Sequence, residues 1–242
     1  MVITSKSNPL IKKISKLYEK KHRKEKGLYL VEGIKPVNEC IVAGCVIENI
    51  VCTESLADKY NNAVIVSAEV FETISSEKNP QGVLAIVKKP QNNLKPPQDS
   101  CILLDCLQDP GNLGTIVRTA NAAGIKDIYL INCTDPYAPK AVRASMSGIF
   151  FVNIYQGTKG EVLNILSGVK LVCADMNGEN IFEFSVPGKF CLCIGNEGNG
   201  ISQDLINNAD YKIKIPMDKS CESLNAAVSA GIAMYQLKYN KR

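Results

Sequence analysis

A glycine-rich loop that directly follows an apolar run constrains the fold of this chain more than any other feature. The run at residues 190–194 is typical of a buried strand in a parallel sheet. The loop at residues 195–200 contains three glycines, which let a backbone approach a ligand closely or adopt positive φ. Ligands of open α/β sheets bind at the carboxyl ends of strands, so this pattern predicts an α/β domain with a binding site at the loop. A tight turn with solvated polar side chains is the alternative.

A proline-rich stretch divides the chain of 242 residues. Residues 88–99 hold three prolines and many polar residues, a composition typical of a linker. We therefore predict a small domain at residues 1–90, a linker at residues 91–99 and a second domain at residues 100–242. Strand-like and helical segments alternate in both parts, which predicts two α/β layer domains. In the second part we expect strands at residues 101–105, 127–131, 169–174, 190–194 and 211–215.

Positive charge is concentrated at the start of the chain. The net charge is +4, but residues 1–30 hold nine Lys or Arg against two Glu, which gives this segment +7 and leaves −3 for the rest. A helix is expected to begin at Asn8-Pro9, with apolar residues on one face and lysines on the other. Such a segment suits a bound polyanion, and a solvated helix face is the alternative. The candidate RNA-binding cations here are Lys12, Lys13, Lys16, Lys20 and Arg23.

Cysteine, histidine and hydropathy patterns argue against several classes of protein. No apolar stretch approaches the roughly 18 residues that a membrane span requires, and the first residues do not resemble a signal peptide. The ten cysteines form no Cys-x-x-Cys pair, and His22 is the single histidine, so we expect no metal site. Reduced, buried thiols in a cytoplasmic protein that does not bind membranes are the expectation.

The stretch at residues 107–124 predicts a helix with a polar start. Asn112 is a candidate N-cap, and Gly124 is placed to end the helix. Arg118 lies off the apolar stripe, one turn beyond Gly114, where no side chain crowds it. A cation in this position suits contact with a phosphate or a ribose, whereas an ordinary surface arginine is the alternative.

Another polar loop lies between a strand end at Ile215-Pro216 and a long helix. We expect Ser223 to cap this helix, which then runs to about residue 238. An apolar stripe predicts that the helix packs on its own domain. A second face would let another helix pack closely, because it consists of the small residues Ala226, Ser229, Ala230 and Ala233.

Together these segments resemble the SpoU family of the SPOUT superfamily, which are RNA ribose 2′-O-methyltransferases that use S-adenosylmethionine. Any one motif is weak, but the ordered set is specific. The motifs are Asn112-x-Gly114-x-x-x-Arg118, Gly195-Asn-Glu197-Gly-x-Gly200, and Ile215-Pro-Met with Ser223-Leu-Asn225.

The first ninety residues resemble the small substrate-binding domain of that family, which is similar to certain ribosomal RNA-binding proteins. This resemblance is softer. It rests on Asn8-Pro, Leu30-Val-Glu32-Gly33 and Asn79-Pro-Gln-Gly82.

The resemblance implies a fold that general topology rules do not predict. Those rules favour an ordinary doubly wound sheet. The family instead threads its C-terminal segment through a loop to form a deep trefoil knot, binds S-adenosylmethionine there in a bent shape, and works as a homodimer through its C-terminal domain. Carried over to this sequence, the cofactor-binding residues are Gly195, Asn196, Gly198, Ile215, Met217 and Leu224.

The resemblance also assigns catalytic residues, which are Arg118, Asn112, Glu197, Ser223 and Asn225. The family gives the general-base role to the arginine of the first motif, here Arg118. A guanidinium stays protonated in proteins, so we expect Arg118 instead to orient the RNA phosphate and the 2′-OH and to stabilise the developing alkoxide. Glu197, Ser223 and Asn225 would orient it or relay the proton, and no metal is required.

Other functions stay open on the residues alone. A base C5-methyltransferase would use a cysteine nucleophile, and Cys221 lies in a suitable loop. A non-catalytic RNA-binding protein could share the fold. Both ribosomal and transfer RNA are substrates within the family, and the additional N-terminal domain favours ribosomal RNA.

Overall fold

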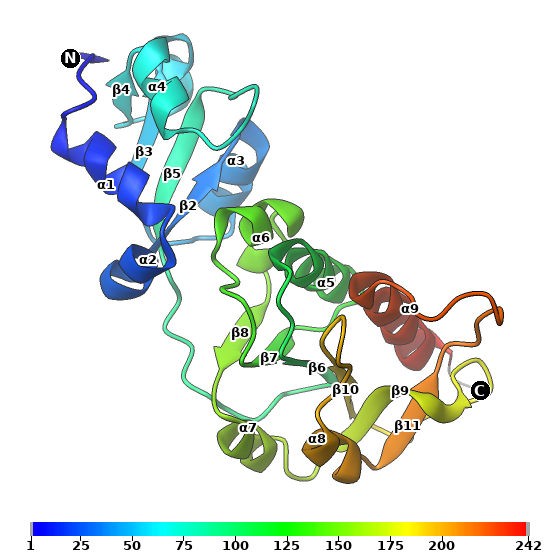
Figure 1. Cartoon of the computed structure of the whole chain (residues 1–242). Coiled ribbons are helices and arrows are strands. Elements are labelled where there is room, and N and C mark those ends of the chain that lie inside the picture. Colours follow the sequence, from blue (N-terminus) through cyan, green and yellow to red (C-terminus); the bar gives the residue numbers. More distant parts are fainter. Residues whose placement is uncertain (1, 241–242) are drawn as a thin grey trace. The chain divides into compact units, whose positions relative to one another are not determined.

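The computed structural model describes residues 2–240, which form two compact units (Figure 1). The first unit contains the chain up to Gln91 together with Asp135–Phe150, and the second contains Asn92–Thr134 and the chain from Phe151 onward. The segment Asp135–Phe150, which lies inside the second domain as we drew it from the sequence, therefore packs with the first unit.

The first unit is built on a five-stranded mixed sheet with the order β1-β4-β3-β5-β2. Strand β5 is antiparallel to both β2 and β3, whereas β3 and β4 are parallel. The strands are β1 (Val2–Ile3), β2 (Leu28–Glu32), β3 (Ile47–Thr53), β4 (Val64–Val66) and β5 (Val83–Lys88). The helical segments are α1 (Pro9–Leu17), α2 (Lys20–Lys26), α3 (Ile34–Val42), η1 (Glu54–Lys59), α4 (Ala68–Ile74), α6 (Pro139–Ala144) and η2 (Gly148–Phe150).

Helix α1 begins as the sequence predicts. The Asn8 side chain accepts a hydrogen bond from the backbone N–H of Leu10 at 2.9 Å, and Pro9 is the first helical residue. Ile11, Ile14 and Leu17 are buried together with side chains of α4 and the sheet, so the apolar stripe of α1 faces the core.

The segment Asp135–Phe150 is attached to the first unit by a buried ion pair. The Arg23 side chain is almost completely buried, and its Nε donates to Asp135 Oδ2 at 2.8 Å. Its Nη1 also donates to the carbonyl oxygens of Leu17 and Tyr18. The prediction that Arg23 contacts RNA does not fit this placement, because its guanidinium is engaged inside the unit.

The second unit is built on a six-stranded parallel sheet with the order β11-β9-β10-β6-β7-β8. Helices α5 and α9 cover one face and α7 and α8 the other (Figure 1). The strands are β6 (Cys101–Asp105), β7 (Asp127–Ile131), β8 (Asn153–Gln156), β9 (Lys170–Asn180), β10 (Phe190–Ile194) and β11 (Tyr211–Lys214). The helices are α5 (Pro110–Ala122), α7 (Lys159–Ile165), α8 (Gln203–Asn207) and α9 (Ala226–Tyr239).

Three of the expected strands have the predicted bounds, because β6, β7 and β10 are buried along their whole length and are apolar runs in the sequence. Strand β9 extends six residues beyond the expected end at residue 174. Strand β8 was not predicted. It is an edge strand of four residues, of which only Ile154 and Tyr155 are buried, so it leaves no apolar run.

Helix α9 differs from the prediction in its cap and its packing. Its N-cap is Asn225, whose side chain accepts from the backbone N–H groups of Ala227 and Val228, and not Ser223. Ala230 and Ala233 of the small face are buried within the unit, where α9 packs on α5. The helix that packs closely on these two alanines therefore belongs to the same chain, and neither alanine is exposed for contact with a second copy.

Breaking the buried ion pair should destabilise the first unit. We expect Asp135→Ala to lower the free energy of unfolding by about 3 kcal/mol, because the Arg23 guanidinium stays buried without its carboxylate. Urea unfolding measures the change. Glu39→Ala, which removes the surface pair with Lys35, is the control and should cost less than about 1 kcal/mol. Equal losses of unfolding free energy in the two variants would contradict a stabilising role for the buried Arg23–Asp135 ion pair.

Candidate active site

A cavity of about 830 Å³ opens in the second unit where the segments that follow β9, β10 and β11 meet the start of α9. The parallel strands bring these segments together at one edge of the sheet. All six residues that the resemblance assigns to the cofactor line this cavity, and they are Gly195, Asn196, Gly198, Ile215, Met217 and Leu224. Glu197, Ser223 and Asn225 line it as well.

The glycine loop closes on its own backbone. Asn196 and Gly200 exchange two backbone hydrogen bonds of 2.9 and 3.0 Å, and the Asn196 side-chain oxygen accepts from the N–H groups of Gly198 and Asn199. A Cβ at position 195 would overlap with the carbonyl group of Gly200, and Gly200 itself has φ +67°. Gly195 and Gly200 are thus required by the loop itself: Gly200 has the positive φ that the sequence suggested, and the close approach at Gly195 is to the loop's own backbone.

The carboxylate of Glu197 joins this loop to the start of α5. Its Oε1 accepts from the side-chain amide of Asn112 at 3.0 Å and from the N–H of Asp109 at 3.2 Å. Its Oε2 accepts from the N–H of Gln108 and the side-chain amide of Asn196, both at 3.4 Å. Partial burial acts to raise the pKa of Glu197, but these hydrogen bonds outweigh it and hold the pKa below its usual range. Glu197 is therefore ionised at neutral pH.

A second hydrogen bond extends this connection to α9. The Asn225 amide donates to Asn112 Oδ1 at 3.0 Å, while Asn112 donates to Glu197. One residue of each sequence motif is thus linked in the chain Asn225–Asn112–Glu197. Asn112 is not the N-cap that we expected: Asp109 caps α5 by accepting from the Asn112 N–H, and Asn112 lies in the first turn with its side chain free for these contacts.

Arg118 and Ser223 are placed differently from this linked trio. Arg118 is exposed on α5, and no hydrogen bond or ion pair engages its guanidinium within the chain from Val2 to Asn240. It does not line the cavity. Ser223 lies exposed in the loop before α9, where its carbonyl oxygen accepts from the Cys221 thiol.

Several cavity residues were missed by the sequence reasoning. Ala174 is the last residue of the expected strand, and Asp175 and Met176 lie in the unpredicted extension of β9. The signal in the sequence is Gly178, where a Cβ would overlap with the backbone of Lys212 and Ile213 in β11. A glycine inside a strand marks such a close approach of two backbones.

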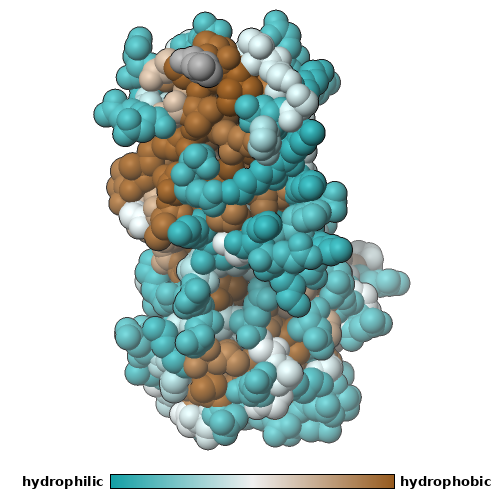
Figure 2. All heavy atoms as spheres, turned by 90° about the vertical axis from the view of Figure 1, so that its left-hand side faces the viewer, coloured by the Kyte–Doolittle hydropathy of each residue, from teal (hydrophilic) through white to brown (hydrophobic). Residues whose placement is uncertain are grey.

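The lysines expected to bind RNA divide into two groups. Lys12, Lys16 and Lys20 are exposed on α1 and at the start of α2. Lys13 forms an ion pair with Glu48. The face of the molecule that carries α1 and α2 shows both hydrophilic side chains and hydrophobic patches (Figure 2).

Residues 2–240 hold neither a cluster of metal ligands nor a helix that could span a membrane. From Val2 to Asn240, no group of three or more His, Cys, Asp or Glu side chains could hold a metal ion. No helix in that range has the length and apolar character needed to cross a membrane.

Comparison with known proteins connects this site to a family. The model of the SpoU rRNA Methylase family matches residues 99–235, and the model of the MRM3-like substrate binding domain matches residues 8–85. The chain belongs to the SpoU rRNA methylase family. The resemblance on which the sequence reasoning relied is thereby confirmed, and the structure has the mixed α/β fold of this family, for which a trefoil knot is expected.

Two relatives cover nearly the whole length of this SpoU protein, and a third covers little more than half. It is 30% identical to the 23S rRNA (guanosine(2553)-2′-O)-methyltransferase RlmP of Bacillus subtilis, over 98% of each chain. A crystal structure of an AdoMet-bound rRNA methyltransferase from Sinorhizobium meliloti superposes with a TM-score of 0.89 and 30% identity, covering 98% of this chain and 96% of that one. The A. aeolicus TrmH/SpoU tRNA modifying enzyme, 26% identical with a TM-score of 0.52, covers only 59% of this chain and 75% of its own.

Closure of the glycine loop should be necessary for ligand binding. We expect Gly195→Ala to abolish binding of S-adenosylmethionine, because the new Cβ forces Gly200 away and opens the loop. Isothermal titration calorimetry measures the binding, and circular dichroism checks the fold. Gly160→Ala is the matched control, since a Cβ in α7 there meets nothing within 4 Å. Wild-type affinity in Gly195→Ala would refute this account of the loop.

Proposed function

We propose that this protein is a methyltransferase that uses S-adenosylmethionine to methylate a ribose 2′-OH in ribosomal RNA. The observation that carries the proposal is a cavity lined by the second and third motifs, to which the first motif is tied by the hydrogen bonds of Asn112 with Glu197 and Asn225. Both matched family models and the full-length relatives agree with it.

The cavity suits S-adenosylmethionine in size and lining. A volume of about 830 Å³ lies in the range of small-molecule sites. Backbone groups of the glycine loop offer hydrogen bonds, while Ile194, Ile215 and Leu224 offer apolar contact for an adenine ring. When bound, the cofactor supplies an electrophilic methyl group on a sulfonium.

The protein side of the reaction consists of positioning and charge. Asn225 and Glu197 hold Asn112 in the first turn of α5, and the same helix carries Arg118. The free guanidinium of Arg118 orients an RNA phosphate and the 2′-OH and stabilises the negative charge that develops on the ribose oxygen. Ser223 contributes an exposed hydroxyl at the cavity wall, which can relay the proton of the ribose 2′-OH to water.

Ribosomal RNA is preferred over transfer RNA because of the first unit. The rRNA methyltransferases named above match this chain over both units, whereas the tRNA modifying enzyme of A. aeolicus matches little more than half of it. A substrate in the ribosome, together with ten free cysteines, supports a cytoplasmic location.

The proposal is tested by mapping methylated riboses in RNA from cells with and without the gene. We expect one 2′-O-methyl ribose in ribosomal RNA to disappear without the gene, and purified protein to restore it. Loss of a 5-methyl pyrimidine, with activity that requires Cys221, would favour the base methyltransferase. No methyl transfer to any RNA would favour a non-catalytic RNA-binding protein.

Arg118 should affect the chemical step and not cofactor binding. We expect Arg118→Ala to lower the single-turnover rate by about 10²–10³, and Arg118→Lys to retain slightly more activity, because lysine keeps the charge but loses the planar fork. Affinity for S-adenosylmethionine should be nearly unchanged in both, since Arg118 is not a cavity residue. Lys170→Ala, a surface cation paired with Asp210, is the control. A Kd that rises in step with the loss of rate would contradict this role.

The pH dependence separates the two roles of Arg118. If Arg118 acts through its charge, the logarithm of the rate should rise linearly with pH in the wild type and in both variants. A plateau near neutrality in the wild type that vanishes in Arg118→Lys would assign it the role of base.

The exposed lysines of the first unit should contribute RNA affinity. Replacing Lys12, Lys16 and Lys20 with Gln should make the slope of log Kobs against log[salt] less steep by about 2, because each lysine that neutralises a phosphate releases counterions. Filter binding with in-vitro-transcribed 23S rRNA measures the slope. Lys35→Gln on α3 is the control. An unchanged slope would show that these lysines do not contact RNA phosphates and form an ordinary solvated helix face.

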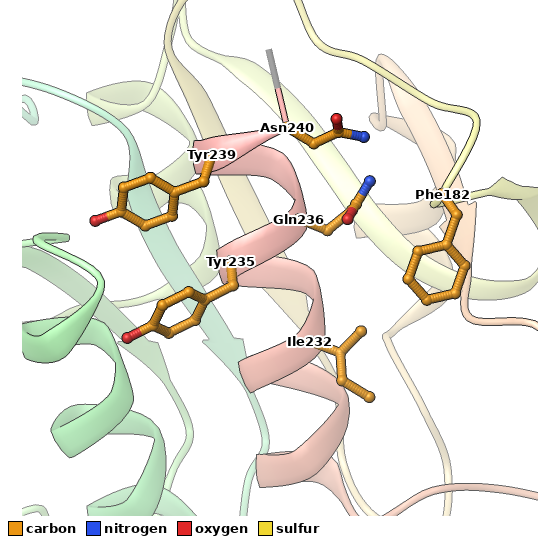
Figure 3. A pocket seen from close by; sticks show the side chains of 6 residues that line it. All are labelled: Phe182, Ile232, Tyr235, Gln236, Tyr239 and Asn240. Carbon is orange, nitrogen blue, oxygen red and sulfur yellow. The ribbon is translucent and has the colours of Figure 1, made fainter. Parts of the chain in front are cut away.

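We also propose that the protein is a homodimer through the exposed face of α9. Tyr235 and Tyr239 are 46% and 60% exposed and, together with Ile232 and Phe182, line one open hollow of about 810 Å³ (Figure 3). Apolar side chains gathered on an exposed helix face are typical of an interface, and the SpoU resemblance implies a second copy of the chain as the partner.

Charge on this face should separate the two copies. We expect Tyr235→Glu to halve the mass measured by light scattering after size-exclusion chromatography, because two carboxylates would meet across a symmetric contact. Val42→Glu, an exposed apolar position of the first unit, is the matched control and should leave the mass unchanged. A monomeric wild type would disprove the proposal.

A further inference from the structure

We propose that the segment Asp135–Phe150 forms part of the RNA-binding surface and that Met146 contacts a base of the RNA. The inference rests on the proposed function. It assigns an RNA contact to a segment that lies within the sequence range of the methyltransferase family model but packs with the substrate-binding unit.

Several contacts fix this segment to the first unit. Asp135 holds the buried Arg23, and its other oxygen lies 3.7 Å from Lys89 Nζ. The rings of Tyr137 and Tyr29 have centroids 4.9 Å apart, and α6 packs against β2. Any surface that the segment presents is thus part of the unit expected to bind RNA.

The charge of the segment suits a polyanion. After Asp135, residues 136–150 include Lys140 and Arg143 and no acidic residue. Arg143 is about half exposed; its guanidinium forms an ion pair with Glu77 and donates to the Ser76 hydroxyl in the loop after α4. A phosphate at Arg143 would therefore share the guanidinium with Glu77 and would meet a side chain that is already ordered.

Met146 is an exposed apolar residue on an unfavourable backbone. Its side chain is 54% exposed, whereas the neighbouring Ser145 and Ser147 are buried. Met146 has φ +45° and Ser147 has φ +67°, in the left-handed region that glycine adopts far more easily. The turn is held by the Ser145 hydroxyl, which donates to the Val142 carbonyl at 2.6 Å.

An exposed thioether on a backbone suited to glycine points to a function of the side chain, because the fold alone would be served better by glycine. Methionine makes favourable contacts with aromatic rings and inserts between nucleic-acid bases. Unpaired RNA bases expose flat faces on which protein side chains stack. An unpaired nucleobase is therefore the ligand that the exposed thioether of Met146 fits.

The test compares Met146→Gly with Asn62→Gly in the full-length protein. Asn62 is another exposed, left-handed residue of the first unit, with φ +62°. Both substitutions relieve the backbone, so neither should lower the thermal midpoint. Filter binding with in-vitro-transcribed 23S rRNA should show about a fivefold to tenfold loss of affinity for Met146→Gly and none for Asn62→Gly. Met146→Leu, which keeps an apolar side chain, should recover part of the loss.

The outcomes separate a failure of the proposed Met146 contact from a failure of the proposed methyltransferase function. RNA affinity in Met146→Gly equal to that of the wild type would overturn the inference, while methyl transfer by both proteins would leave the proposed function standing. If Met146→Gly loses both RNA affinity and thermal stability, Met146→Leu decides. The same loss of RNA affinity in Met146→Leu, at an unchanged thermal midpoint, would also overturn the base contact. A wild type that neither binds nor methylates this RNA would remove the proposed function, and the inference with it.

Discussion

Four hydrogen bonds to one carboxylate hold the catalytic part of this protein together. The oxygens of Glu197 accept from the backbone of Gln108 and Asp109 and from the side chains of Asn112 and Asn196. The negative charge lies at the amino end of α5, where the helix dipole favours it. Through Asn112 the same connection reaches the start of α9. The two loops that line the cavity are thereby tied to the start of α5, which is far from both in the sequence.

This arrangement limits what Glu197 can do. A carboxylate has about four positions for hydrogen bonds, and four donors occupy them here. The hydrogen bonds also hold its pKa below the usual range. Glu197 is therefore unsuited to remove a proton from a ribose. It is a positioning residue, and the burden of stabilising charge on the ribose oxygen falls on Arg118, whose guanidinium has no partner among residues 2–240.

The sequence predicted those features that depend on residues close together in the chain, such as buried strands and the loops that follow them. Buried strands were predicted correctly from apolar runs. The glycine loop and the loop before α9 were both predicted to bind the cofactor and line one cavity, because segments that follow parallel strands meet at one edge of the sheet. Helix N-caps were less predictable, because each helix has two residues near its start that could cap it. They are Asp109 and Asn112 for α5, and Ser223 and Asn225 for α9, and only the backbone geometry decides between them. The burial of Arg23 could not be foreseen, because its partner Asp135 lies 112 positions away in the sequence.

Because Asn112 and Arg118 lie on the same helix, α5, we expect a role for Asn112 in positioning Arg118 for the reaction. It is tested most directly by single-turnover methyl transfer with Asn112→Ala, Arg118→Ala and the double variant, at saturating S-adenosylmethionine. If Asn112 works only through Arg118, removing its amide should slow the wild type strongly but cost almost nothing further once Arg118 is absent. Losses that multiply in the double variant would contradict the account and would place Asn112 in independent contact with the substrate.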